Sequence, residues 1–446
     1  MKTSLFGSTG LAMLLFLAAP VWAADETESA TAKEMNLALL ARIEKLEAEL
    51  AAVREAVQQS TAIATRAETN ATKTAASVIK VKKFASAAAD ASYAGAPSDS
   101  KWHLAGYADV GFVGSNGPNA DSFVTGKFNP SFHFQYKDKL IFESELEFLT
   151  TSDGKTEIEL EYSQVDLFLN DNMTLVMGKF LSPIGQFQER LHPSWINRIQ
   201  GAPAGFGHDG IQPASDTGFQ LRGIIPLAKS KWTYAIAVGN GPRTNSEGGV
   251  AFEGVGRDDN RNKSVGGRVG FFPTPYLEIG GSYLTTRVNG YMGPGAPGLI
   301  LGGPIDARYE LWGFDASLTK GALAARVEYL SSNRDMLFSS TLEDPAGILL
   351  PELGMEAWYG QVSYRLSKIG DSDFIHKLEP VIRYGEFRIS GQNELEEENA
   401  QNRLNIGLNY WLSPTIVTKA GLEWRDFTVA GVDSETLYQF QMAYGF

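Results

Sequence analysis

The amino-acid sequence predicts an all-β fold: a transmembrane antiparallel β-barrel of about 16 strands, preceded by an N-terminal α-helical coiled coil. Three features carry this prediction: a secretory leader, a seven-residue apolar repeat, and an alternation of apolar and polar residues over the rest of the chain. They divide the chain into a signal peptide at 1–23, a coiled coil at 24–90, a linker at 91–101 and a barrel at 102–446.

Residues 1–23 are typical of a secretory signal, with a basic start at Lys2 and small residues suited to signal peptidase up to Ala23. The apolar run at 11–20 is shorter than the roughly 20 residues that span a bilayer. A membrane anchor is the alternative. The chain has no cysteine, which excludes disulfides and a lipid attached to a cysteine.

The composition narrows the class of protein. The formal net charge is −13, which argues against a nucleic-acid-binding protein, because such proteins present basic surfaces. Beyond the leader, no apolar stretch has the length of a membrane helix, whereas a β-barrel dilutes its apolar residues by alternation. These totals also allow a soluble secreted protein.

The segment 31–90 is rich in Ala, Glu, Lys and Gln. Its apolar residues recur at alternating steps of three and four, which favours a left-handed coiled coil. The core positions are Leu39, Ile43, Leu46, Leu50, Val53, Val57, Ala64, Ala67, Ala71, Val78 and Val81. Self-association would cover this long apolar seam, whereas one helix packed on another surface is the alternative.

The last residues of the chain show the two-residue alternation most clearly. Aromatic or apolar side chains occupy every second position, at Tyr438, Phe440, Met442, Tyr444 and Phe446. One face therefore suits lipid and the other suits water. The pattern resembles the C-terminal signature of outer-membrane barrels, which implies outer-membrane lipid as surroundings and the barrel-assembly machinery as a partner through Phe446. A soluble β-sandwich that ends in an amphipathic strand is the alternative.

The same alternation recurs in about 16 segments, an even number as in single-chain bacterial barrels. The expected strands are 102–114, 123–137, 140–150, 156–170, 173–181, 215–225, 231–239, 262–273, 276–288, 307–320, 322–332, 355–366, 376–390, 402–411, 415–429 and 434–446. Short connections such as 137–139 alternate with longer ones such as 182–214. Short periplasmic turns and long external loops are the layout of such barrels.

Charged residues at water-facing positions are candidates for a pore lining. The acidic ones, on two neighbouring strands, are Glu143, Glu145, Glu147, Glu157, Glu159 and Glu161. The basic ones, on later strands, are Arg222, Arg268, Arg326, Arg383, Arg403, Lys419 and Arg425. Closing the sheet would set the basic arc across from the acidic patch, and this transverse field would favour polar or zwitterionic solutes. The alternative is a set of solvated faces whose charges pair locally.

The longest connection, 182–214, combines apolar residues that could pin it to a wall with polar ones that could narrow a pore. The candidates for a constriction are Glu189, Arg190, His192, Arg198, His208 and Asp209. A loop packed on the barrel rim or at a trimer interface is the alternative. The two histidines have the chemistry of metal ligands, but their spacing matches no standard zinc pattern, so we expect no metal and no cofactor.

These features together resemble the sixteen-stranded porins of Gram-negative bacteria. Within that class the chain is similar to the phosphate-selective group and to porins with an N-terminal periplasmic coiled coil. The resemblance rests on the leader, the heptads, the stretch 177–185 and the C-terminal Tyr444-Gly445-Phe446, and it spans nearly the whole mature chain.

The resemblance implies a homotrimer in the outer membrane, with the coiled coil in the periplasm. Each subunit would hold a water-filled channel for passive diffusion of small hydrophilic solutes or ions, with the third external loop folded inward. The acidic patch does not fit the phosphate-selective group, because a pore selective for phosphate calls for a dense row of basic residues.

Two other functions remain open at this point. A structural tether could use the coiled coil to hold the trimer in register or to bind peptidoglycan. A barrel enzyme is the second, but the chain has only five histidines and no recognisable nucleophile motif, so we expect no enzyme.

Overall fold

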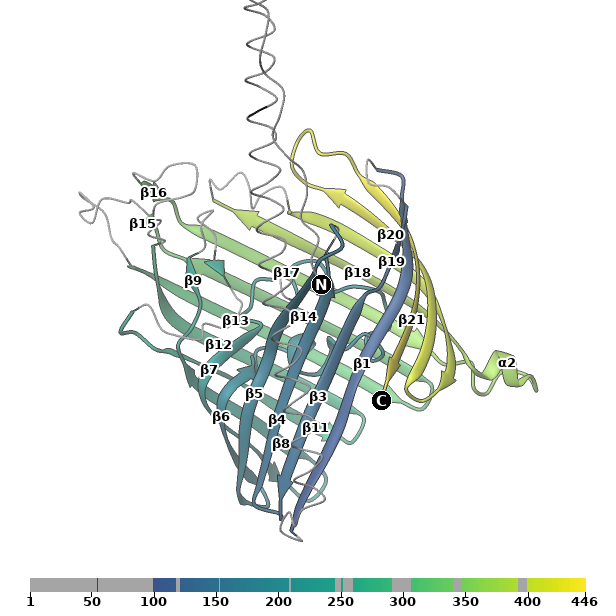
Figure 1. Ribbon diagram of the computed structural model, residues 1–446, viewed down its shortest axis with the longest axis horizontal. Coiled ribbons are helices and arrows are strands. Elements are labelled where there is room, and N and C mark those ends of the chain that lie inside the picture. The colour runs from purple at the N-terminus through teal and green to yellow at the C-terminus, as the bar shows by residue number, and fades with distance from the viewer. Residues whose placement is uncertain are drawn as a thin grey trace, which may run out of the picture. The chain divides into compact units, whose positions relative to one another are not determined.

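The computed structural model describes residues 54, 99–117, 121–151, 153–207, 210–244, 250–251, 260–290, 306–339, 347–391 and 399–446. The expected signal peptide, nearly all of the expected coiled coil and most of the expected linker lie outside these residues. The chain divides into a unit at 1–95 and a unit at 96–446, and the second unit contains the strands (Figure 1).

The second unit is a closed antiparallel barrel. Its sheet has 17 strands, of which β2 (Ser122–Val124) is a three-residue addition to β1, so sixteen long strands form the wall in the described part of the chain. The long strands are β1 (Ser100–Ser115), β3 (Lys127–Tyr136), β4 (Leu140–Thr150), β5 (Thr156–Asn170), β6 (Met173–Leu181), β7 (Ser215–Pro226), β8 (Lys231–Gly239), β11 (Ser264–Thr274), β12 (Leu277–Asn289), β13 (Asp306–Lys320), β14 (Leu323–Arg334), β17 (Leu353–Tyr364), β18 (Leu378–Ser390), β19 (Gln401–Ser413), β20 (Ile416–Phe427) and β21 (Glu435–Gly445).

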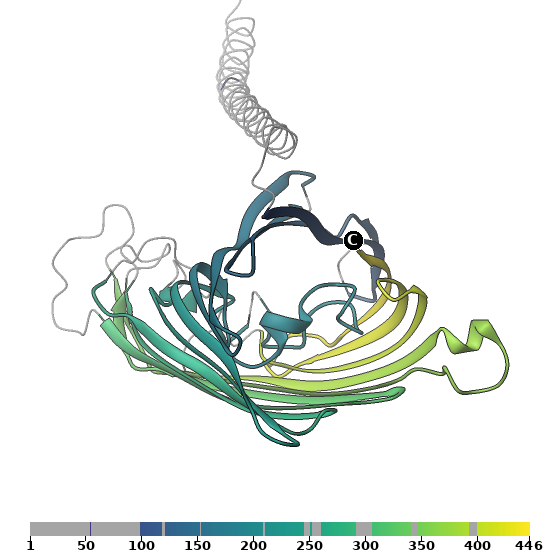
Figure 2. The same ribbon diagram turned by 90° about the horizontal axis from the view of Figure 1, so that it is seen from below.

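The first and last strands close the ring that Figure 2 shows end-on. β1 pairs with β3 along its first half and with β21 along its second half. Two backbone hydrogen bonds join Gly106 and Phe446, at 3.0 Å and 2.9 Å. Closure leaves no unpaired strand edge between β21 and β1, as a membrane barrel requires.

Small elements decorate this wall. Two two-stranded sheets form from β9 (Arg243–Thr244) with β10 (Val250–Ala251) and from β15 (Leu337–Ser339) with β16 (Ile348–Leu350). A π-helical turn, η1 (Phe187–Leu191), and a four-residue helix, α2 (Asp373–His376), lie in two of the connections. Among the described residues, no helix has the length and apolar character needed to cross a membrane.

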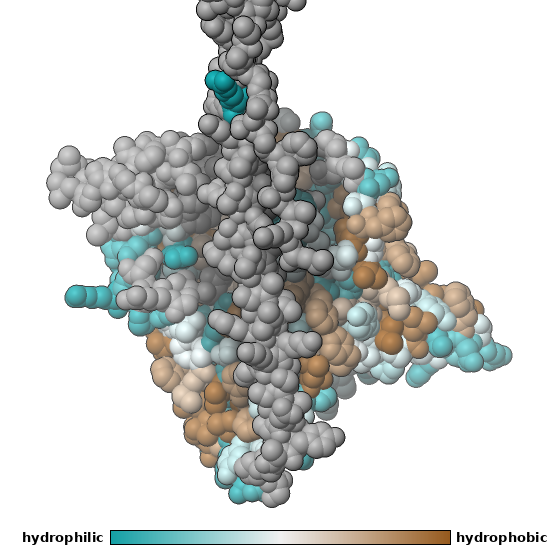
Figure 3. All heavy atoms as spheres, in the orientation of Figure 1, coloured by the Kyte–Doolittle hydropathy of each residue, from teal (hydrophilic) through white to brown (hydrophobic). Residues whose placement is uncertain are grey.

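The alternation of side chains separates two environments. On β21, Tyr438 and Phe440 are 46% and 52% exposed on the outer face, whereas Ala443 is fully buried on the inner face. Leu408 and Ile406 on β19 lie outward in the same way. Apolar side chains therefore gather on the outside of the strands in Figure 3. The predicted barrel of about 16 strands, apolar outside and polar inside, is confirmed.

The structure departs from the expected strands in a few places. The segment expected as one strand at 123–137 is broken into β2 and β3 at Gly126, because its φ of 54° lies outside the strand region. Another residue would not fit there, since a Cβ would collide with the Asp109 carboxylate. β1 begins at Ser100, within the expected linker. The connection between β17 and β18 contains α2.

Candidate functional site

The segment Ser182–Ala214, between β6 and β7, folds into the barrel (Figure 2), and we call it the inward segment. Its neck is closed by the backbone hydrogen bond from Ser182 to Ala214, at 3.0 Å. His208 and Asp209 lie outside the described residues, so nothing is said of their geometry. The rest of the segment contacts the lumen wall in three successive parts.

The first part enters against β12, β13 and β14. The backbone N–H of Gly185 donates to Ser282 Oγ at 3.0 Å, and that of Gln186 donates to Glu328 Oε1 at 2.9 Å. The Gln186 side chain donates to the Asp315 carboxylate at 2.5 Å. Buried carboxylates thus satisfy backbone and side-chain donors that the turn before η1 leaves free.

Charged side chains hold the end of η1. Arg190 donates to Glu278 Oε2 at 2.9 Å, and Glu278 also pairs with Arg268 at 2.9 Å. Arg268 donates in addition to Asp315 through its Nε at 2.8 Å. Arg268 therefore links two of the carboxylates that receive donors from the inward segment, and its own charge is compensated within the wall.

The second part, Pro193 to Ala202, contacts the basic residues of β18 to β20. Lys419 Nζ donates to the carbonyl of Ser194 at 2.5 Å. Arg383 donates to the carbonyl of Gly201 at 3.3 Å, and Arg403 donates to that of Ala202 at 3.1 Å. Three of the predicted pore-lining cations thus serve as donors to the backbone of the inward segment.

Arg198 ties this second part to the wall in the other direction. Its Nε donates to Glu379 Oε1 at 3.1 Å, and its guanidinium lies 4.8 Å from the centre of the Trp411 ring. The Arg198 carbonyl accepts from the Asn409 side chain at 3.0 Å. The side chain predicted for a constriction therefore acts as an anchor on the wall side of the segment.

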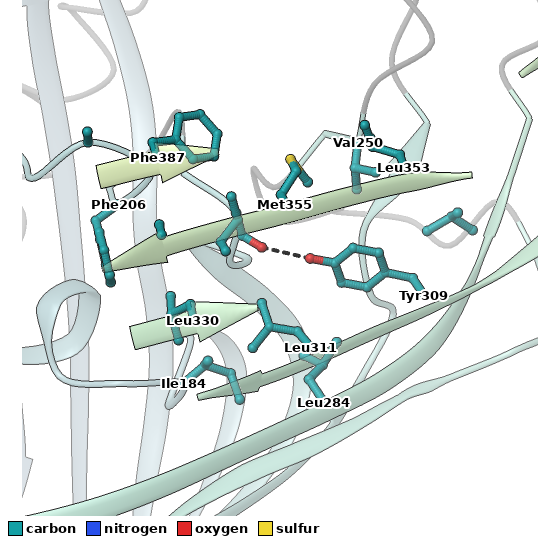
Figure 4. Close-up of a cluster of buried hydrophobic side chains, with 14 of the residues drawn as sticks. Ile184, Phe206, Val250, Leu284, Tyr309, Leu311, Leu330, Leu353, Met355 and Phe387 are labelled. Carbon is teal, nitrogen blue, oxygen red and sulfur yellow. Dashed lines mark hydrogen bonds between the residues drawn. The ribbon is translucent and has the colours of Figure 1, made fainter. Parts of the chain in front are cut away.

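The third part packs by apolar contact, as Figure 4 shows. Phe206 lies edge-on to Tyr359 with ring centres 5.0 Å apart, and Tyr309 donates its hydroxyl to the Ile211 carbonyl at 2.7 Å. Ile184 and Ile211 are fully buried among lumen-facing apolar residues of β12, β13, β14 and β17. The lumen thus contains an apolar patch that the inward segment covers, so that both surfaces are buried.

The acidic residues lie on the opposite side of the lumen. Glu145 and Glu147 are buried on β4, whereas Glu157 and Glu159 are exposed on β5. A bulge interrupts the register of these strands, because Glu145 pairs with Tyr162 and the next residue pairs with Leu160. Glu161 is the extra residue at this bulge, and strict alternation therefore fails beyond it.

Two cavities lie between the inward segment and the acidic wall. The larger has about 460 Å³, and its charged lining is Asp109, Lys127, Glu147, Glu157 and Glu159. The smaller has about 190 Å³, and its charged lining includes Glu143, Glu145, Glu189 and Arg222. His192 lines both, so it lies where they adjoin. Carboxylates outnumber cations in each.

Three predicted cations remain. Arg222 and Arg425 are compensated by nearby carboxylates, and Arg326 is partly buried. Arg222 pairs with Asp166 and lies 3.7 Å from Glu189. Arg425 pairs with Glu423 and, at 3.3 Å, with Glu435. Arg326 is partly buried on β14, opposite Gln361 of β17.

Sequence reasoning missed several charged residues that contact the inward segment, line the cavities or pair with a predicted cation. They are Asp109, Lys127, Asp166, Glu278, Asp315, Glu328, Glu379 and Glu423. Each is a single charge at a lumen-facing position of a strand, which the alternation could have marked except at Asp166, because that residue follows the bulge in β5. Asp315 and Glu328 are direct cross-strand partners, an unfavourable pairing of like charges unless donors come from elsewhere.

Among the described residues, no group of three or more His, Cys, Asp or Glu residues is arranged to hold a metal ion. His192 lies 4.0 Å from Glu145, and its ring is 6.1 Å from that of Tyr107.

No family model and no curated protein matches the sequence. The fold is similar to that of solved outer-membrane proteins. A loop L8 deletion mutant of OmpT, an outer membrane protein of Vibrio cholerae, gives a TM-score of 0.52 at 12% identity and covers 78% of this chain and 100% of that chain. OmpT folded in vitro, in trimer form, gives 0.50 at 12% identity, with 78% and 99% covered.

An anion-selective porin from Comamonas acidovorans gives a TM-score of 0.50 at 13% identity, and the match covers 78% of this chain and 100% of that chain. At these identities the likeness establishes a shared sixteen-stranded barrel fold.

Proposed function

We propose that the protein is an outer-membrane porin that forms a water-filled channel for passive diffusion of small hydrophilic solutes or ions. One observation supports this most: the inward segment packs on one side of the lumen and leaves two cavities along the other, of about 460 Å³ and 190 Å³, with charged side chains in their linings. The fold shared with a porin from Comamonas acidovorans supports the same proposal.

We further propose that the channel favours cations. Three residues of the predicted basic arc, Arg383, Arg403 and Lys419, lie on the covered side, where they donate to carbonyls of the inward segment. Carboxylates outnumber cations in the lining of the two cavities along the acidic wall, although Arg222 lines the smaller one and, with Arg190 and Arg268, a further cavity of about 280 Å³. The transverse field thus differs from the one expected, because the backbone of the inward segment lies between these three cations and the two cavities.

The experiment is a reversal-potential measurement on single channels in a planar bilayer under a salt gradient. We expect cation preference, and we expect the triple change Glu143→Gln, Glu145→Gln and Glu147→Gln to weaken it. If the triple variant gives stepwise currents with the same cation preference as the wild type, the protein is still a channel but these three residues do not line its path. Protein that inserts without conducting would contradict the porin.

Assembly follows from the same proposal. The chain would form a homotrimer, as the OmpT trimer form does, with its apolar outer face in outer-membrane lipid. The barrel-assembly machinery would recognise the C-terminal strand through Phe446. The coiled coil expected at 24–90 would lie in the periplasm and hold the trimer in register. That the protein is no enzyme stays a prediction.

Peptidoglycan is a candidate partner of that coiled coil. Co-sedimentation of the full-length protein with peptidoglycan, compared with a variant that lacks residues 24–90, separates a tether from a trimerisation element. Loss of sedimentation in the shortened variant would add tethering to the channel function.

A further inference from the structure

A cluster of hydrogen-bond acceptors surrounds Glu145 where the two cavities adjoin. Glu145 Oε1 receives the side-chain amide of Asn129 at 3.1 Å, and Oε2 receives Ser131 Oγ at 2.8 Å. Glu147 receives the same amide at 3.3 Å and Lys127 at 2.7 Å. We call Asn129, Glu145, Glu147 and His192 the acceptor cluster.

The first unmatched acceptor is on His192. Its Nδ1 lies 2.5 Å from the carbonyl of Gln188, and a carbonyl can only accept, so Nδ1 carries a hydrogen. In the neutral ring, Nε2 then presents its lone pair. The side chain is only 9% exposed, Nε2 has no hydrogen-bond partner, and Glu145 Oε1 faces it at 4.0 Å. Two acceptors thus face each other with no donor between them.

The second unmatched acceptor is on Asn129, which is fully buried on β3. Its Nδ2 faces three oxygens, those of Tyr107, Glu145 and Glu147, which fixes the orientation of the amide. Its Oδ1 has no partner. Buried acceptors without donors are costly, and a ligand that supplies donors removes that cost.

Three members of the acceptor cluster line the cavities, whereas Asn129 is fully buried and lines neither. Glu147 and His192 line the larger cavity, and Glu145 and His192 line the smaller one. The only basic residue in the larger cavity's lining is Lys127, which is already paired with Glu147. A solute that passes from one cavity to the other therefore moves past a negatively charged site in which Nε2 of His192 has no donor.

We propose that the acceptor cluster binds the N–H donors of a small organic cation, an ammonium or guanidinium group, as the solute crosses the channel. The proposal rests on the proposed channel function and names the class of solute. Charge alone would attract any cation, whereas Nε2 of His192 adds a requirement for hydrogen on the cation. Donor-bearing cations are therefore distinguished from quaternary ones.

The test compares two blockers of equal charge and chain length, butylammonium and butyltrimethylammonium, of which only the first has N–H donors. Each is titrated against the potassium current of single channels formed by the full-length protein. We expect butylammonium to reach half-block at a concentration about tenfold lower, as one or two charge-assisted hydrogen bonds allow. Equal half-block concentrations would mean that the site attracts cations by its negative charge alone, and they would overturn the proposal.

Two variants locate the effect. His192→Phe and Glu145→Gln should bring the ratio of the two half-block concentrations close to one. Glu159→Gln is the matched control, because this exposed carboxylate lines the larger cavity outside the acceptor cluster and should weaken both blockers alike. Retention of the full ratio in His192→Phe would overturn the proposal.

A second readout does not depend on conduction. The melting temperature of the detergent-solubilised protein should rise more with butylammonium than with butyltrimethylammonium, and His192→Phe should remove the difference. Protein that never conducts but shows this difference would contradict the channel and keep the site. Stabilisation by Zn²⁺ that depends on His192, with no discrimination between the two ammonium compounds, would assign the cluster to a metal instead.

Discussion

Glu328 on β14 accepts the backbone N–H of Gln186 at 2.9 Å, although the two residues are 142 positions apart in the sequence. The Tyr359 hydroxyl donates to the other oxygen of the same carboxylate at 3.2 Å, and Glu328 is 1% exposed. A buried carboxylate in the barrel wall thus fixes the point at which the inward segment turns into the lumen. Four predictions follow from the way this segment is held.

Replacement of Glu328 by alanine should loosen the inward segment. The buried N–H of Gln186 would lose its acceptor, at a cost of about 1–3 kcal/mol in the folded state. We expect a larger and noisier single-channel conductance. Glu328→Gln is the control, because its amide oxygen can still accept, and its conductance should stay near that of the wild type. An unchanged conductance in Glu328→Ala would show that this contact does not position the segment.

Gly185→Ala should disturb the same contact from the other side. Gly185 has a φ of 66°, and a Cβ there would collide with the Glu328 carboxylate. The left-handed backbone alone costs an alanine about 1–2 kcal/mol. We expect the conductance change of Glu328→Ala to be reproduced. Because both changes act on one contact, the double variant should give less than the sum of the two, and full additivity would contradict a shared cause.

Phe206→Ala should loosen the inward segment from the apolar patch on the lumen wall. The ring packs edge-on against Tyr359 and Phe187, and removal of a buried aromatic ring costs about 3–5 kcal/mol. The measurement is trypsin cleavage of the folded protein at Arg190 and Arg198, which the wild type should resist. Phe314→Ala is the control, because that ring is 62% exposed and should leave the segment protected. Equal protection in Phe206→Ala would show that the apolar patch is dispensable.

The sequence predicted the barrel wall well, because side chains along each strand alternate between lipid and the lumen and their polarity alternates with them. On β4, β6 and β8, the expected and observed strands have the same bounds, 140–150, 173–181 and 231–239. Alternation fails where the backbone departs from regular pairing. The bulge that contains Glu161 shifts the later part of β5, so Asp166, and not Val165, contacts Arg222.

The arrangement inside the barrel could not be predicted in the same way. The contacts of the inward segment join residues that are far apart in the sequence, such as Ser194 with Lys419 and Ile211 with Tyr309. No local pattern encodes these pairs. Apolar residues at lumen positions, such as Leu311 and Leu330, depart from the polar-inside rule, and that departure was the available signal.

The final prediction tests whether the inward segment divides the charges of the lumen. Lys127 lines the larger cavity, whereas Arg403 donates to the Ala202 carbonyl on the covered side and its side chain is 15% exposed. Lys127→Gln and Arg403→Gln each remove one positive charge. If only the open side contacts the permeating ions, Lys127→Gln should raise the cation-to-anion permeability ratio by roughly two- to fivefold, the effect of one unit charge at close range in water. Arg403→Gln should change that ratio less and should instead raise the conductance, because the Ala202 carbonyl loses a donor.

Reversal potentials under a salt gradient measure the permeability ratio, and single-channel amplitudes measure the conductance. Equal shifts in the permeability ratio would mean that both walls face the ions, and the transverse field would then act across the open channel.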